Sequence, residues 1–215
     1  NSDEAVYLGQ AAALANEPTL SRFFPLFRAH PLLFPYIVSL TIPFVGYPGL
    51  DLAGRLLVVA FGLATVALTF ATGRVLFGRW VGATAALLLA LMPYHVIVTR
   101  QALLDSPMAF FVTLSLLGFV HYGATRRFSW LIASSIGLGL AVLTKETAIV
   151  SLGGLRVTLA LHAELSGRLR HLAAAFAVFI GVVALHPLAT LLAGGSGTER
   201  TKQYLVWQLF RRPNH

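Results

Sequence analysis

Long apolar stretches separated by short polar breaks dominate the amino-acid sequence. Almost no charged side chain interrupts these stretches, and they lack the strict alternation of apolar and polar residues that is typical of a half-buried β-strand. Runs of this length cross the ~30 Å hydrocarbon core of a bilayer as α-helices, because a helix satisfies its own backbone hydrogen bonds there. The pattern predicts an all-α polytopic membrane protein with six transmembrane helices, over residues 52–77, 81–98, 107–122, 129–143, 148–161 and 172–192.

Residues 1–51 follow a different pattern and are predicted to form an outer loop with juxtamembrane helices. The stretch SDEAVYLGQAAALAN is typical of a short helix that begins near Ser2 and stops at Asn16. Repeated prolines then break the next apolar segment, which fits helices lying at the membrane surface rather than a span. Residues 52–193 hold the predicted transmembrane helices, and residues 194–215 begin another outer loop.

Composition supports the membrane assignment and excludes other classes of protein. Of the 215 residues, 57% are hydrophobic and 11% are charged, whereas a soluble domain carries about 25% charged residues. The absence of cysteine excludes disulfides, thiol redox chemistry and thiolate metal sites. The net charge of +8 does not indicate nucleic-acid binding, because the basic residues are scattered between the spans. The chain begins with Asn rather than Met, so we expect it to be a piece of a longer protein.

The charged residues between the predicted spans separate by sign across the membrane. Arginines fill the breaks RVLFGRW, GATRRF and HAELSGRLRH, and the positive-inside rule makes their side cytoplasmic. We therefore expect an integral membrane protein, of a prokaryotic plasma membrane or of the endoplasmic reticulum, with an extracytoplasmic active site. The extracytoplasmic side receives seven of the eight carboxylates, which are Asp3, Glu4, Glu17, Asp51, Asp105, Glu146 and Glu199.

Charged residues at the predicted outer ends of the helices are candidates for function, because charge beside hydrocarbon is costly. A carboxylate there can act as a general base on a hydroxyl or hold a divalent metal, and a lysine can neutralise a phosphate. Structural roles stay open for the same residues, since acids favour helix N-termini and charged side chains anchor span ends at the interface. The candidates are Asp3, Glu4, Asp105, Lys145 and Glu146.

Several motifs follow one another in a fixed order along the chain. They are DEAVYLGQAAALA in the first outer loop, HPLLFPYIVSL, the series PYHVIVTRQALLDSP, and GLGLAVLTKETA. In this order and with this spacing of spans, the sequence resembles the GT-C fold glycosyltransferases of the protein O-mannosyltransferase and lipid A aminoarabinose transferase superfamily. The resemblance covers nearly the whole chain and implies a GT-C-like transmembrane bundle.

The resemblance implies catalytic roles for three carboxylates. Asp3 falls on the acid that is assigned as the base for the acceptor hydroxyl, and Glu4 is its neighbour in the same motif. Asp105 would position the acceptor or a metal. A neutral hydroxyl is a poor nucleophile near neutral pH, so a base beside the anomeric carbon is needed.

The resemblance also implies that basic residues bind the donor phosphate, namely Lys145, Arg100 and His30. The lipid phosphate is already a good leaving group and needs charge neutralisation more than protonation. Some relatives hold a divalent metal through an outer-loop acid and a histidine after the sixth span seen here, which implies Glu4 and His215 as ligands in this chain.

The sequence therefore predicts an integral-membrane glycosyltransferase. It would move a sugar from a polyprenyl-phosphate donor to a hydroxyl of a protein, lipid or glycan acceptor on the extracytoplasmic side, among membrane lipids and without a nucleic-acid partner. Two alternatives stay open: a transporter or flippase of a lipid-linked anionic substrate, and a noncatalytic subunit that kept the fold. A transporter would place polar residues near the bilayer midplane, whereas here they gather at one outer edge.

Overall fold

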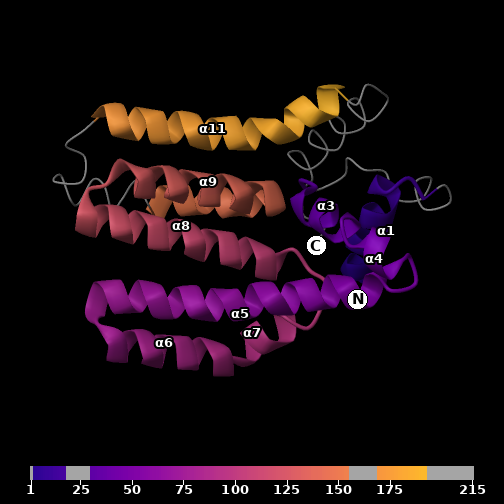
Figure 1. The fold of residues 1–215 in the computed structure, drawn as a ribbon, viewed down its shortest axis with the longest axis horizontal. Helices are drawn as coiled ribbons and strands as arrows, with labels where there is room; N and C mark the ends of the chain where they lie inside the picture. The colour runs from indigo at the N-terminus through magenta and orange to yellow at the C-terminus, as the bar shows by residue number, and fades with distance from the viewer. Residues whose placement is uncertain (1, 18–29, 155–168, 193–215) are drawn as a thin grey trace, which may run out of the picture.

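The computed structural model describes residues 2–17, 30–154 and 169–192, and the regular structure in these ranges is helical. The long helices lie side by side in a row, with α5 and α8 running one way and α9 and α11 the other (Figure 1). Each helix packs on the next one in the row. In this order the helices are α6 (Arg79–Leu91), α5 (Leu50–Phe77), α8 (Asp105–Thr125), α9 (Phe128–Thr144) and α11 (Leu169–Leu192).

Apolar faces turned away from the bundle identify the described helices as membrane segments. Three segments are long and apolar enough to cross a membrane: Leu50–Phe77, Asp105–Thr125 and Arg170–Ala189. Large hydrophobic side chains on their outer faces stay exposed, Leu63 and Leu188 among them, and such surface suits lipid rather than water. The predicted class, an all-α polytopic membrane protein, is confirmed.

The second predicted span is not one helix. The chain over residues 81–98 forms most of α6 and then α7 (Pro93–Val98), with Met92 between them in an extended conformation at φ −67° and ψ 118°. Proline disfavours the helical conformation in the residue before it and has no N–H to continue the helix, so Pro93 starts a new one.

The fifth predicted span is described only in its first part. A short 3₁₀ helix, η1 (Glu146–Ile149), is followed by helical backbone over residues 150–154. The remainder of that span, the final outer loop and His215 lie outside the described residues.

Small residues let the helices approach closely. A Cβ added at Gly73 of α5 would lie 2.7 Å from the Cα of Gly82 in α6. Between α8 and α9 the hydroxyls of Ser115 and Ser134 share a hydrogen bond of 3.1 Å, and a Cβ at Gly118 would lie 2.9 Å from the Ser134 nitrogen. Because lipid tails are as apolar as the helices, such close packing, rather than the hydrophobic effect, associates helices in a membrane.

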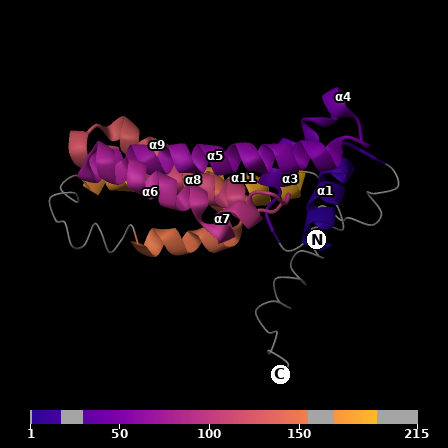
Figure 2. The same ribbon diagram turned by 90° about the horizontal axis from the view of Figure 1, so that it is seen from below.

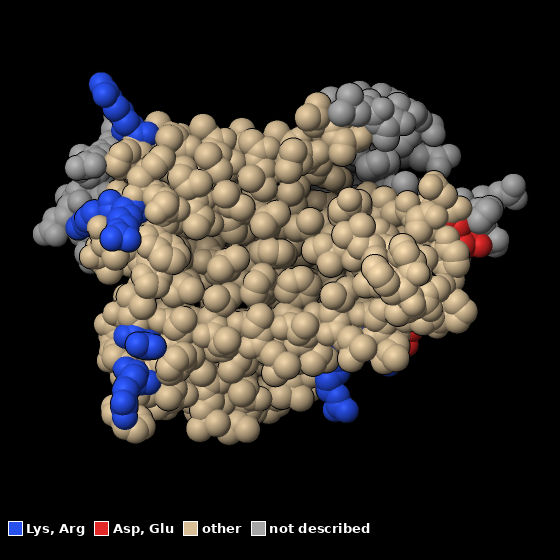
Figure 3. All heavy atoms as spheres, in the orientation of Figure 1, with Lys and Arg blue, Asp and Glu red and all other residues tan. Residues whose placement is uncertain are grey.

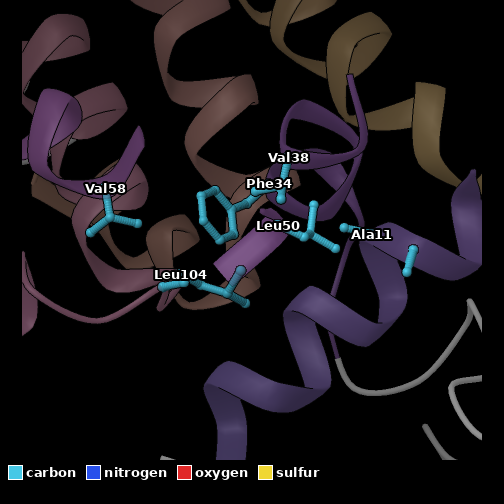
Figure 4. Close-up of a cluster of buried hydrophobic side chains, with 8 residues drawn as sticks. Ala11, Phe34, Val38, Leu50, Val58 and Leu104 are labelled. Carbon is cyan, nitrogen blue, oxygen red and sulfur yellow. The ribbon is translucent and has the colours of Figure 1, made fainter. Parts of the chain in front are cut away.

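Three short helices cover one end of the bundle: α1 (Ser2–Leu14), α3 (Leu33–Ser39) and α4 (Ile42–Val45) (Figures 1 and 2). They share an apolar core with the start of α5 and the turn before α8 (Figure 4). Phe34 and Val38 of α3 are completely buried in it. The predicted N-terminal helix is confirmed, and it ends at Leu14, two residues before the predicted stop at Asn16, which takes a positive φ of 64°. Other residues of this core are Ala11, Leu50, Val58 and Leu104.

The described acids gather at one end of the bundle, where Arg55 and Lys145 pair with two of them. Arginines gather at the end away from α1, acidic side chains appear beside α1, and a further basic side chain lies closer to the acidic end (Figure 3). Arg74 lies in the last turn of α5 and Arg126 caps the end of α8, whereas Asp51 and Asp105 lie in the first turns of those same helices. The bundle therefore has the charge separation that the sequence predicts.

We expect Gly82→Ala to destabilise the protein by about 1–3 kcal/mol, because the added methyl would overpack α6 against α5. The new Cβ would lie 2.6 Å from the Phe70 carbonyl oxygen. Thermal unfolding in detergent measures the effect. Gly181→Ala in α11 is the matched control, since a Cβ there meets nothing within 4 Å. Equal melting temperatures for the two variants would contradict this packing.

Candidate active site

The Glu4 carboxylate links three segments at the acidic end of the bundle. Arg55 of α5 donates from Nε to Glu4 Oε1 at 3.0 Å and from Nη2 to Oε2 at 3.3 Å. The backbone N–H of Ala102, in the turn before α8, donates to Oε1 at 2.9 Å. Burial raises the pKa of this carboxyl, but the hydrogen bonds from Ala102 and Arg55 outweigh burial, so the pKa lies below its ordinary value.

The Glu4 contacts do not suit the predicted metal role. Both carboxylate oxygens already accept hydrogen bonds, and the residue is only 5% exposed. Within residues 2–17, 30–154 and 169–192, no group of three His, Asp or Glu side chains could hold a metal ion. His215, the other predicted ligand, lies outside these ranges. The pairing of Glu4 with His215 therefore stays a prediction, because one of its two ligands lies outside the described residues.

Asp105 and Lys145 form an ion pair between the start of α8 and the end of α9. Lys145 Nζ donates to Asp105 Oδ1 at 2.8 Å, although the two residues are 40 positions apart. Their side chains are 34% and 24% exposed, so the pair is reachable from solvent. Lys145 directly follows α9, and its extended backbone at φ −152° and ψ 122° turns the chain from α9 into η1. A predicted catalytic acid and a predicted phosphate-binding cation thus meet.

A second pair lies beside the first, because Glu146 is the next residue after Lys145. His30 Nδ1 lies 2.8 Å from Glu146 Oε2 and 3.0 Å from Oε1. Burial raises the pKa of the Glu146 carboxyl, but the hydrogen bond from His30, with smaller contributions that include the charge of Lys145, brings the pKa below its ordinary value. The contact holds the segment before α3 against the start of η1.

Tyr7 is a residue that the sequence reasoning did not single out for chemistry. It lies one helical turn after Asp3 on α1, is half-buried, and packs against the apolar core of the outer end. Burial, followed by the charges of Asp3, Asp105 and Glu146, raises the pKa of its hydroxyl to about 12. The charges of carboxylates from three separate segments therefore act on one tyrosine, and the signal that could have found it is its spacing from Asp3.

The remaining predicted site residues differ in how close they lie to these pairs. Asp3 is exposed on α1, near enough for its charge to act on Tyr7. Arg100 is exposed in the turn after α7 and forms no ion pair with a described residue. The structure thus gathers Asp3, Asp105, Lys145 and His30 around one region and leaves Arg100 apart from their ion pairs.

The fold and this region define a class: an integral-membrane protein that carries a solvent-reachable set of acids and cations at one end of its bundle. Comparison with known proteins makes the class specific. The sequence profile of the dolichyl-phosphate-mannose-protein mannosyltransferase family matches residues 29–190. The chain belongs to this family, whose members are polytopic GT-C membrane proteins. No curated protein and no solved structure matches the chain.

We expect the Glu4 carboxylate to make stability depend on acidic pH. Because folding lowers its pKa, its stabilising contribution is complete above the ordinary value of 4.5 and is lost as pH falls through the lower folded-state value. Melting temperatures of the wild type and Glu4→Gln, measured from about pH 7 down to about pH 3, test this. The wild type should lose more stability over the acidic part of that range than the variant. Parallel curves would show that Glu4 does not contribute in this way.

Proposed function

We propose that the protein is a membrane glycosyltransferase that moves a sugar from a polyprenyl-phosphate donor to an acceptor hydroxyl on the extracytoplasmic side. The observation that carries the proposal is the ion pair of 2.8 Å between Lys145 and Asp105, at the acidic end of the bundle of a chain that belongs to a mannosyltransferase family. The pair brings together a cation suited to a phosphate and a carboxylate suited to a hydroxyl.

The reaction needs one group at each end of the bond that breaks. The acceptor oxygen bonds to the anomeric carbon while the bond from that carbon to the phosphate oxygen breaks. The electron pair leaves on the phosphate, where Lys145 balances the charge, and the hydroxyl proton passes to a carboxylate, for which we propose Asp3. The charges of Asp3 and Asp105 both raise the pKa of the Tyr7 hydroxyl. This arrangement is supported because both carboxylates act on the same group.

In the proposed binding step, the donor phosphate competes with ion pairs that are already formed without substrate. Lys145 is occupied by Asp105, so a donor phosphate would compete with this carboxylate for the lysine. In the same way His30 is occupied by Glu146. We assign Glu4 a positioning role, because its contacts fix α1 rather than face a substrate. Arg100 is a more distant contact for the phosphate or for lipid headgroups.

The position of the paired charges favours transfer over transport. A transporter binds its substrate near the bilayer midplane on interrupted helices. Here the pairs occupy the first residue of α8 and the residues that directly follow α9, at one end of the bundle. A noncatalytic subunit would keep the fold without needing these carboxylates, so loss of activity in carboxylate variants separates an enzyme from that alternative.

We expect Asp3→Asn and Asp105→Asn each to abolish sugar transfer, because an amide cannot accept the proton or carry the charge. Both variants should stay folded, as measured by melting temperature in detergent. Transfer from polyprenyl-phosphate mannose to acceptor, followed by radiolabel, gives the activity. Asp51→Asn is the control carboxylate, since Asp51 pairs with Arg55 and does not contact Lys145. Normal turnover in both test variants would reject the catalytic proposal.

We expect Lys145→Ala to raise the apparent KM for the lipid donor by about 10-fold or more, the effect of losing a charge-assisted contact. Arg126→Ala, at the opposite end of the bundle, is the matched loss of a cation. The measurement is initial rate against donor concentration at saturating acceptor. An unchanged donor dependence in Lys145→Ala would remove the phosphate-binding role.

A further inference from the structure

Tyr7 packs beside the ion pair of His30 and Glu146. Its ring centroid lies 6.3 Å from that of His30, at an angle of 56° between the ring planes, and His30 is the partner of Glu146. The charge of Asp105, the partner of Lys145, also acts on the Tyr7 hydroxyl. Tyr7 therefore lies beside the His30–Glu146 pair, and Lys145 of the other pair is the chain neighbour of Glu146.

Packing holds the ring of Tyr7 in place and leaves its hydroxyl available for a hydrogen bond. The residue is half-buried and packs on the apolar core of α1, α3 and α5, so its ring direction is set by packing. Among the described residues the hydroxyl has no hydrogen-bond partner. The Tyr7 hydroxyl stays protonated, because burial and then the charges of carboxylates raise its pKa to about 12. The Tyr7 hydroxyl is therefore an available, neutral hydrogen-bond donor.

The charges around Tyr7 decide which part of a lipid-linked sugar it suits. Carboxylates repel a phosphate, so the phosphate belongs at Lys145, which is the cation of the first pair. A sugar has the opposite needs: its hydroxyls donate to carboxylates and accept from a neutral donor, and its C–H face packs on an aromatic ring. Because Lys145 is the chain neighbour of Glu146, whose partner His30 packs against Tyr7, the two regions adjoin, as phosphate and sugar do in one donor molecule.

We propose that Tyr7 forms a sugar-binding subsite of the candidate active site, with its hydroxyl donating to a hydroxyl oxygen of the donor sugar. This inference rests on the proposed glycosyltransferase function and adds a specificity-determining residue to it. Tyr7 lies outside the part of the chain that matches the family profile, so the assignment comes from the contacts alone. In this arrangement Lys145 binds the phosphate of the donor and Tyr7 binds its sugar.

The test compares two lipids that differ only by the sugar. The full chain, in nanodiscs, is titrated with polyprenyl-phosphate mannose and with sugar-free polyprenyl phosphate. Tyr7→Phe keeps the ring and removes the hydroxyl, so binding of the mannose-linked lipid should weaken about 3- to 10-fold. Binding of the sugar-free lipid should stay within about 2-fold of wild type, since the lost hydrogen bond does not involve the phosphate.

Two control variants show whether the effect belongs to the Tyr7 hydroxyl and to the sugar. Lys145→Ala should weaken both lipids alike, because it removes a phosphate contact. Tyr94→Phe, at a tyrosine that is 65% exposed on α7, should change neither. The melting temperature of Tyr7→Phe should match the wild type, which shows that the ring still packs.

Other outcomes overturn the inference. Equal weakening of both lipids by Tyr7→Phe would make Tyr7 a phosphate contact or a scaffold, and no weakening of either would remove it from the site. In both cases the wild type still binds and transfers the sugar, so the proposed function survives. If instead the wild type binds neither lipid, the proposed function itself fails, and the Tyr7 assignment fails with it.

Discussion

The buried carboxylate of Glu4 holds together the segments on which the candidate site depends. It joins α1 to Arg55 of α5 and to the backbone N–H of Ala102, in the turn before α8. A buried charge is tolerated only when it is paired and hydrogen-bonded, so α1 is fixed where both partners reach Glu4. A Cβ at Gly54 would lie 2.6 Å from Leu8 Cδ2, so α1 also needs a glycine beneath it. With α1 fixed in this way, Tyr7 packs against His30, the partner of Glu146.

The adjacent residues Lys145 and Glu146 organise the rest of the outer end. One pairs with Asp105 at the start of α8 and the other with His30 before α3, so two distant segments are tied to a single point after α9. The pairs are partly exposed, which limits what they add to stability but leaves them free to exchange partners. A site with its charges already balanced can accept a charged phosphate by exchange, without burying an uncompensated ion.

Close helix packing supplies the rigid frame beneath this site. Glycine and serine bring α5 against α6 and α8 against α9, which a bilayer requires because hydrophobic burial does not drive its helices together. The break before Pro93 separates α6 from α7, and a Cβ at Gly62 would meet Thr99 Cγ2 at 2.4 Å, so the turn after α7 lies directly on α5. That turn carries Ala102 and leads into Asp105, which places the catalytic candidate at the bundle end.

The sequence by itself determined the helical membrane class, the separation of charge along the bundle and the candidate acids, because hydrophobicity, helix length and charge are local properties of the chain. The helix break at Pro93 is also a local property of the chain. The prediction nevertheless placed one continuous span over residues 81–98, because the whole segment is apolar. Only the tertiary structure decided which charges pair. Glu4 accepts a hydrogen bond from the backbone N–H of Ala102, 98 residues away along the chain. The composition of the sequence does not show which backbone N–H will pair with a given carboxylate. The position of Tyr7 was hidden for the same reason, since only the folded chain brings its ring against His30.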